Sequence, residues 1–191
     1  LGQGSEGRAR GFTALDLSID STSKARILDS RFQAQGSIGI NDSDFMFVEI
    51  PEAYLATSAQ LTGAYTFTAG RKIETWNTMD STWALGAWNP RFRWDYLRPQ
   101  EVGMLGFSAG VQTSSIRAVV FASPFFIPDR GTPLDFADGR IRSISPWVLN
   151  PPSKVEISKG KVTDIKYQAQ IPATMDVVMN PSISTMIRVG E

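Results

Sequence analysis

The chain of 191 residues contains neither cysteine nor histidine. The absence of cysteine excludes disulfide bonds, thiol catalysis and thiolate metal sites. The absence of histidine excludes a Ser-His-Asp arrangement, an imidazole general base and a histidine-ligated metal. We therefore predict that the chain is not an enzyme and has no metal or cofactor, and only carboxylates remain as candidates for catalysis or metal binding.

An excess of charge and long apolar runs are also missing. The sequence has 19 Lys and Arg residues against 19 Asp and Glu residues, so its formal net charge is zero. A general attraction to nucleic acid is therefore not expected, and nucleic acid is excluded as a partner. No apolar run reaches the length of about 18 residues that a transmembrane helix needs, although a transmembrane strand is much shorter.

What the sequence does contain is a repeated alternation of apolar and polar side chains. In residues 162–171, Ile165 and Tyr167 share one face of a strand, while Lys166 and Gln168 share the other. Successive Cβ atoms of a strand point to opposite sides, so one face is apolar and the other polar. The same period predicts antiparallel strands over residues 12–20, 26–40, 45–57, 61–73, 103–112, 115–123, 154–158, 162–171 and 177–189.

Two architectures fit such strands. A soluble β-sandwich or barrel turns its apolar faces inward, whereas a membrane barrel turns them to lipid and keeps its polar faces around a wet lumen. Three features favour the membrane barrel. The polar faces are rich in Ser, Thr, Gly and Gln, the apolar faces include small residues, and aromatic residues lie near strand ends. The aromatic residues predicted to lie at the membrane interface are Tyr54, Trp76, Trp88, Trp94, Tyr96 and Trp147.

Arginines and aromatic residues also alternate in two long irregular regions, residues 76–100 and 124–152. Loops of this length are usually functional or disordered. One interpretation is that their cations constrict a lumen and favour anions or carboxylated solutes. The other is that they stack on aromatic rings and pair with Asp95, Asp129 or Glu101, which would brace the loops. The candidate pore-lining residues, on loops and strands together, are Arg71, Arg91, Arg93, Arg98, Arg117, Arg130 and Lys166.

Two pairs of carboxylates are candidates for catalysis or calcium binding. Asp42 and Asp44 form one pair, and Asp135 and Asp138 form the other. Asp42 and Asp44 lie between strand-like runs, where Asp and Asn commonly form turns. A turn is therefore the preferred interpretation.

Three landmarks give the sequence a resemblance to a known family. They are the segment Gly70-Arg71-Lys72-Ile73-Glu74-Thr75-Trp76, the turn Asn89-Pro90-Arg91 with Trp94-Asp95, and the segment Phe125 to Gly131. Together with the strand rhythm over roughly residues 50–190, they resemble porin-like outer-membrane β-barrels of Gram-negative bacteria. The resemblance implies a barrel in the bacterial outer membrane whose partners are the lipid bilayer and small solutes.

The prediction is therefore an all-β, antiparallel transmembrane β-barrel over residues 12–191, preceded by a flexible polar segment over residues 1–11. The last predicted strand lacks a terminal aromatic residue, so we expect the barrel to be part of a larger one, and a homo-oligomer or larger membrane assembly is compatible with this. The alternative is a soluble or peripheral β-sandwich or barrel domain that binds a ligand or a partner protein.

Overall fold

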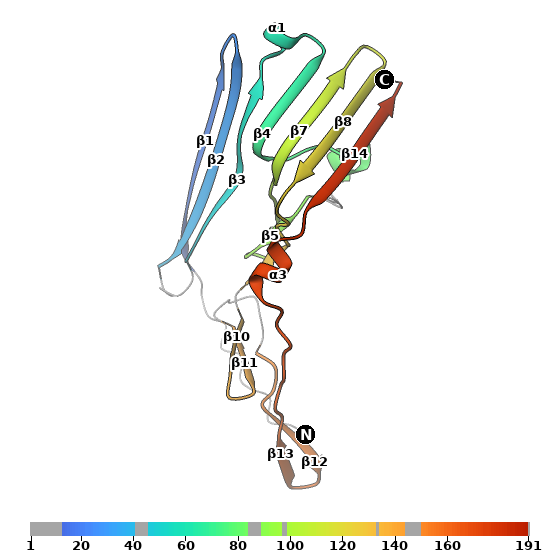
Figure 1. Cartoon of the computed structure of the whole chain (residues 1–191). Coiled ribbons are helices and arrows are strands. Elements are labelled where there is room, and N and C mark those ends of the chain that lie inside the picture. The colour runs from blue at the N-terminus through green and yellow to red at the C-terminus, as the bar shows by residue number, and fades with distance from the viewer. Residues whose placement is uncertain are drawn as a thin grey trace. The chain divides into compact units, whose positions relative to one another are not determined.

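The main element of the computed structural model is one large β-sheet (Figure 1). The structure describes residues 13–40, 46–83, 89–96, 99–132, 134–143 and 150–190. The strands of the large sheet are β1 (Ala14–Lys24), β2 (Leu28–Gly39), β3 (Met46–Thr57), β4 (Tyr65–Lys72), β7 (Met104–Gln112), β8 (Ile116–Ser123) and β14 (Ser182–Val189). They follow this order in a seven-stranded sheet, and the pairs from β3 to β14 are antiparallel. The sequence prediction of antiparallel strands is confirmed for these seven.

Shorter elements lie outside the large sheet. The helices are α1 (Ala59–Thr62), α2 (Thr78–Trp83) and α3 (Thr174–Val178). A small sheet contains β5 (Arg91–Arg93), β6 (Gln100–Glu101) and β9 (Arg130–Gly131). Two hairpins pair β10 (Leu134–Ala137) with β11 (Arg140–Ser143) and β12 (Lys154–Ser158) with β13 (Lys161–Asp164). Among the residues that the structure describes, none of these helices has the length and hydropathy needed to cross a membrane.

The chain divides into two compact units. One comprises Ser18–Gln35, Val48–Gly131 and Gln170–Glu191, and it holds most of the large sheet. The other comprises Leu1–Leu17, Gly36–Phe47 and Thr132–Ala169, and it holds the two hairpins. The predicted flexible segment, residues 1–11, lies outside the described residues.

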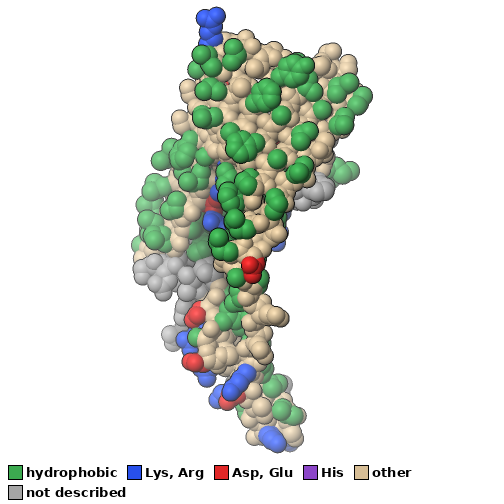
Figure 2. Space-filling model, viewed as in Figure 1, with side chains coloured by type: hydrophobic (Ala, Val, Ile, Leu, Met, Phe, Trp, Pro, Cys, Tyr) green, Lys and Arg blue, Asp and Glu red, His purple; other side chains and the backbone are tan. Residues whose placement is uncertain are grey.

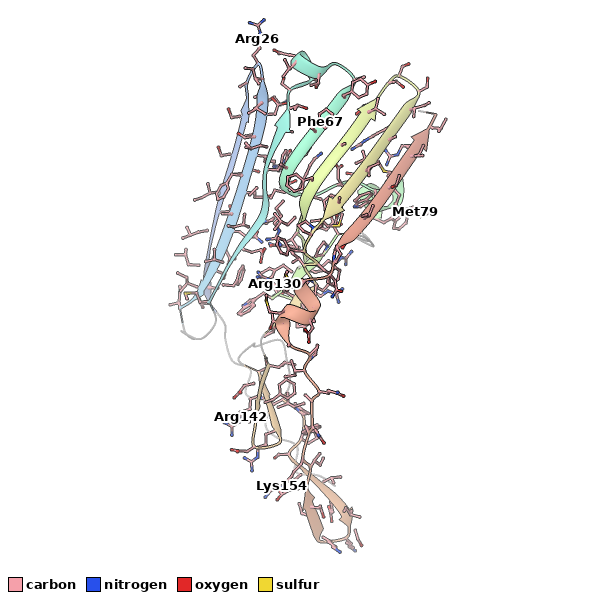
Figure 3. All side chains as sticks on the ribbon, viewed as in Figure 1. Arg26, Phe67, Met79, Arg130, Arg142 and Lys154 are labelled. Carbon is pink, nitrogen blue, oxygen red and sulfur yellow. The ribbon has the colours of Figure 1, made fainter. Side chains whose placement is uncertain are left out.

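One face of the large sheet carries apolar side chains that are exposed. The strand register aligns Leu55, Ala69, Phe107, Ala122 and Ile183 in one row across β3, β4, β7, β8 and β14. Phe107 is 64% exposed and Ile183 is 80% exposed. Figure 2 shows hydrophobic side chains spread over the sheet face turned to the viewer, and Figure 3 labels one of them, Phe67 on β4. We call this surface the apolar face.

The opposite face, which we call the polar face, is the more buried one. Its central row contains Thr68, Ser108, Phe121 and Ser184. Charged and hydroxyl side chains on this side of the sheet are buried, and they include Glu52, Thr68 and Ser123. Burial is therefore reversed relative to a soluble protein, in which apolar side chains fill the interior.

A small hydrophobic cluster also lies on the polar face. Trp76, from the segment that follows β4, packs with Val119, Phe121 and Met186. The rings of Trp76 and Phe121 meet edge to face, with centroids 6.3 Å apart and an angle of 80° between planes. This contact fixes the segment after β4 against the polar face.

The clearest alternating segment in the sequence does not form the strand that its pattern predicts. Within residues 162–171, regular pairing ends at Asp164. The backbone N–H of Ile165 donates to Ser153 at 2.9 Å, and that of Tyr167 donates to Gly139 at 2.8 Å. These bonds reach two different segments, so no single neighbour offers the continuous ladder that a strand requires.

Three further predictions need correction or refinement. Within the described ranges the large sheet is open, with β1 and β14 each paired on one side, so no closed barrel is formed there. The regions predicted to be irregular contain β5, β6, β9, β10 and β11, and these strands are too short to show a period. The predicted run 61–73 is broken by α1 and begins as a strand only at Tyr65, because Ser58 caps the helix through Gln60 N–H at 3.3 Å.

A close approach of strands β7 and β8 requires glycine at position 106. A Cβ atom built on Gly106 would lie 2.4 Å from the carbonyl oxygen of Ala122 and 2.8 Å from Cζ of Phe121. We expect Gly106→Ala to lower the free energy of unfolding by about 1–3 kcal/mol, the usual cost of overpacking. Urea titration followed by circular dichroism measures this change.

The matched control is Gly110→Ala, on the same strand and the same face. Its Cβ atom would lie 3.3 Å from the nearest atom, the carbonyl oxygen of Ala118, so a small shift accommodates it. Equal destabilisation by the two substitutions would contradict this register of β7 against β8.

Candidate functional site

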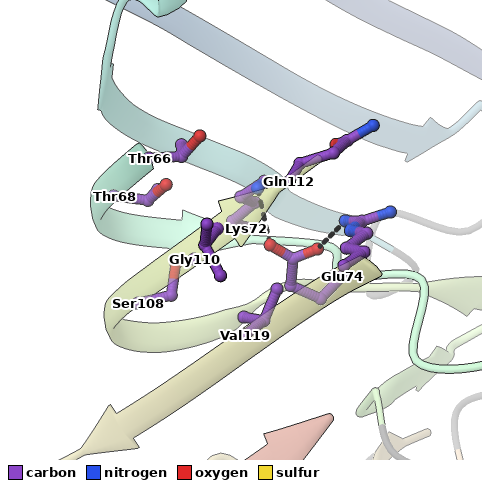
Figure 4. Close-up of a pocket in the computed structure, with 10 residues that line it drawn as sticks. Thr66, Thr68, Lys72, Glu74, Ser108, Gly110, Gln112 and Val119 are labelled. Atoms are coloured by element: carbon purple, nitrogen blue, oxygen red, sulfur yellow. Dashed lines mark hydrogen bonds and ion pairs between the residues drawn. The ribbon is translucent and has the colours of Figure 1, made fainter. Parts of the chain in front are cut away.

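A polar pocket lies on the polar face, between strands β4, β7 and β8 (Figure 4). Its volume is about 140 Å³, which suits a ligand of a few non-hydrogen atoms. The side chains that give it chemical character are Thr66, Thr68, Lys72, Glu74, Ser108, Gln112 and Arg117. The alternation of side chains along a strand brings several of these groups together. Thr66 and Thr68 share one face of β4, and Ser108 on β7 is paired with Thr68.

Three charged side chains form one wall of this pocket. Lys72 Nζ lies 2.6 Å from Glu74 Oε1, and Arg117 Nη2 lies 3.1 Å from Glu74 Oε2. The Glu74 side chain is only 7% exposed, whereas those of Lys72 and Arg117 are 24% and 31% exposed. Two cations against one carboxylate leave an excess of one positive charge beside the pocket.

Glu74 is held in place by its own neighbours along the chain. The side-chain amide of Asn89 donates to the carbonyl oxygen of Glu74 at 2.9 Å, and Trp76 Nε1 donates to Asn89 Oδ1 at 3.3 Å. Asn89 and Trp76 are both buried. The segment carrying Glu74 is therefore anchored to the polar face by hydrogen bonds as well as by the packing of Trp76.

Thr68 contributes a buried hydroxyl to the pocket. The residue is 6% exposed, and its Oγ1 has no hydrogen-bond partner among the described residues. A buried hydroxyl without a partner costs about 1–3 kcal/mol, so such groups are uncommon in folded proteins. Thr68 is therefore a polar group available to a ligand.

A second charged cluster lies near the end of strand β4. Arg71 Nη1 lies 2.6 Å from Glu49 Oε1 and donates to the carbonyl oxygen of Ile50 at 2.7 Å. Arg130 also pairs with Glu49 and lies over the ring of Phe92, 5.3 Å from its centroid. Figure 3 shows Arg130 where the strands of the large sheet end. The Glu49 side chain is 1% exposed, so its charge requires a cationic partner, and each of its oxygens has one.

A third buried carboxylate joins strands β2 and β3. Glu52 Oε2 lies 2.8 Å from Nε of Arg31, and Glu52 Oε1 accepts the backbone N–H of Ile73 at 3.0 Å. Nearby, Lys72 Nζ lies 5.7 Å from the ring centroid of Tyr54. The polar face therefore holds several linked charged and aromatic groups rather than isolated charges.

The predicted pore-lining cations do not form one group. Arg71 and Arg130 share Glu49, while Arg117 belongs to the pocket described above. Arg93 pairs with Asp129 at 2.9 Å, and the backbone N–H of Arg91 donates to Asp129 at 2.8 Å. These contacts are of the kind expected if the arginines brace the loops by pairing with acidic residues.

Two of the predicted cations lie elsewhere. Lys166 lies in the unit that holds the hairpins, beside Gly139. Arg98 lies outside the described residues.

The predicted interface aromatic residues also separate. Trp94 stacks on Phe92, with centroids 6.1 Å apart, and Tyr96 is half exposed. Trp76 is buried in the hydrophobic cluster of the polar face and Tyr54 lies under Lys72, so neither occupies the apolar face where an interfacial residue would meet lipid. Trp88 and Trp147 lie outside the described residues.

Of the two carboxylate pairs, the structure describes only Asp135 and Asp138. Asp135 lies on β10, and Asp138 has a φ of 54° in the turn between β10 and β11. Asp42 and Asp44 lie outside the described residues. No group of three or more acidic side chains suited to a metal occurs in the part of the chain that the structure describes.

The residues that sequence reasoning missed are the buried ones. Glu49, Glu52, Glu74 and Thr68 were not candidate site residues, yet Glu52, Glu74 and Thr68 are buried on the polar face and Glu49 pairs with Arg71 and Arg130. One feature of the sequence points to Glu74: it directly follows a predicted strand and stands two residues after Lys72. Its burial depends on Trp76 and Asn89, whose positions no local pattern reveals.

Loss of the Glu74 carboxylate should destabilise the chain. We expect Glu74→Gln to lower the free energy of unfolding by about 2–3 kcal/mol, because Lys72 and Arg117 would lose their partner on a buried surface. This loss of stability is smaller than the one expected for a fully buried ion pair, because the side chains of Lys72 and Arg117 are partly exposed to water. Urea titration provides the measurement.

Arg93→Gln is the matched control, because it breaks the Arg93–Asp129 pair, whose side chains are 45% and 49% exposed. Exposed pairs contribute about 1 kcal/mol or less. A loss on Glu74→Gln no greater than that on Arg93→Gln would refute the account of the charged wall.

Comparison with known proteins gives no match to any family model, curated protein or solved structure. The resemblance to porin-like barrels therefore stays a prediction from the sequence. The functional proposal rests on the contacts and the burial of this chain's own residues.

Proposed function

We propose that this chain forms part of the wall of a porin-like β-barrel in the bacterial outer membrane. Its apolar face lies against lipid, and its polar face lines an aqueous lumen through which small solutes pass or in which they are recognised. The proposal involves no enzymatic step and no cofactor.

The observation that carries this proposal is the reversed burial of the large sheet. Large apolar side chains such as Phe67, Phe107 and Ile187 are more than half exposed, while Glu52, Glu74 and Thr68 on the other face are less than a tenth exposed. An exposed apolar surface of many residues marks a surface that contacts lipid or another protein. A polar inner face and an apolar outer band are the arrangement of a membrane barrel.

Strand dimensions support the same proposal. The seven strands of the large sheet are 8 to 12 residues long. Tilted strands of about 9–11 residues cross the hydrocarbon core of a bilayer. Bacterial barrels have eight strands or more, so we propose that further strands pair with β1 and β14 in a homo-oligomer or a larger assembly.

A second candidate function follows from an apolar hollow on the apolar face. Its volume is about 560 Å³, and Leu55, Phe67, Phe107 and Val120 are among the residues that line it. A soluble or peripheral domain would use this hollow for an apolar ligand or a partner protein. A soluble domain could instead bury these residues in a dry core. That version is not supported, because Phe107 and Val120 are exposed.

Insertion into vesicles tests the proposed function. We expect the chain, refolded with phosphatidylethanolamine and phosphatidylglycerol vesicles, to stay with the vesicles through an alkaline carbonate wash. Val120→Arg should lower its stability in the bilayer by about 2–4 kcal/mol, because it places a cation on the lipid side near mid-strand. Urea titration of the vesicle-bound protein measures the difference.

Gln112→Arg is the control, since Gln112 lines the polar pocket and an arginine there meets water. Its effect should be below about 1 kcal/mol. A chain that remains monodisperse in buffer without lipid or detergent would contradict the membrane function. Equal effects of the two arginine substitutions would contradict it as well.

A further inference from the structure

We propose that the pocket between β4, β7 and β8 binds a small carboxylate anion, with Arg117 and Lys72 balancing its charge and Thr68 donating a hydrogen bond. The inference rests on the proposed function, because it names the class of solute that the polar face recognises. It requires only residues within one unit of the chain.

The balance of donors and acceptors favours an anion over a cation. Each oxygen of Glu74 already has a cationic partner, Lys72 on Oε1 and Arg117 on Oε2. An ammonium group carries three donors and a guanidinium carries five, so one contact to Glu74 leaves each of them with donors to spare. A ligand entering the pocket therefore meets an excess of donors and positive charge.

Thr68 supplies an independent observation. Its buried Oγ1 has no hydrogen-bond partner among the described residues, and the side chain lines the same pocket. A valine of the same shape would avoid the cost of an unpartnered hydroxyl. A ligand oxygen that accepts the Thr68 hydroxyl proton would supply the missing partner.

The walls of the pocket limit the ligand to a small one. The available volume is about 140 Å³, and Thr66, Gly110 and Val119 line it in one row across β4, β7 and β8. Hydroxyl groups of Thr66 and Ser108 provide further polar contacts for a carboxylate. Acetate, with four non-hydrogen atoms, is a suitable probe, and a ligand of that size should bind with a dissociation constant of about 1–10 mM.

The test is a titration of the detergent-solubilised chain with acetate, followed by the line width of the acetate methyl proton resonance. We expect saturable binding of acetate and no matching binding of acetamide, its neutral analogue of similar shape. Thr68→Val should weaken acetate binding about fivefold to tenfold without loss of stability, because one hydrogen bond is removed. Arg117→Gln should weaken it about tenfold or more.

Thr185→Val is the matched control, because Thr185 lies on β14 in the row that contains Phe67 on the apolar face. It should bind acetate like the unmodified chain. Acetamide binding as tight as acetate binding would overturn the inference, and so would unchanged acetate affinity in Thr68→Val.

The result also stands apart from the vesicle experiment. Selective acetate binding by a chain that does not enter vesicles would support the pocket and reject the membrane function. Vesicle insertion without selective acetate binding would support the membrane function and reject the anion pocket.

Discussion

Buried carboxylates on one side of the large sheet decide which face of its strands carries polar side chains. Glu52 and Glu74 are each less than a tenth exposed, and each is held by at least one arginine or lysine. A carboxylate removed from water without a partner is far too costly to persist. The cations must therefore lie on the same side as the glutamates, which leaves the other side of the strands to the apolar residues.

This constraint also explains why the segment after β4 lies on the polar face. Trp76 covers Phe121 and Val119, and its indole N–H reaches Asn89, which in turn binds the backbone of Glu74. Packing and hydrogen bonding therefore act on the same short segment. The pocket between β4, β7 and β8 is a consequence, because Glu74 fixes Lys72 and Arg117 on one of its walls.

Much of the large sheet could be predicted from the sequence, since alternation is a local property of a strand with one apolar face. The predicted runs 45–57, 103–112 and 115–123 agree closely with β3, β7 and β8. Residues 162–171 show the limit of this reasoning. Alternation is compatible with a strand, but a strand forms only where a neighbouring segment can pair with it through a ladder of backbone hydrogen bonds. The backbone N–H groups of Ile165 and Tyr167 donate to two different segments, at Ser153 and Gly139.

The candidate site was harder to predict than the strands. The sequence predicts Arg71, Arg117 and Arg130 as cations that line a lumen, but it does not show which residues pair with them. Their partners Glu49 and Glu74 were not named, since burial of a glutamate depends on contacts between residues far apart in the chain. Thr68 lies in the predicted run 61–73, and the alternation does not distinguish it from the other polar residues of that run.

The most direct test of the central claim is a spin-label scan along β7, made possible by a sequence without cysteine. Single cysteines at positions 104, 105 and 107–112 would be labelled in vesicles, and collisions with oxygen, which concentrates in lipid, would be compared with collisions with a water-soluble nickel chelate. The account predicts a period of two, with oxygen maxima at Leu105, Phe107 and Ala109 and nickel maxima at Ser108 and Gly110. Absence of that period, or the opposite phase, would contradict the outward direction of the apolar face.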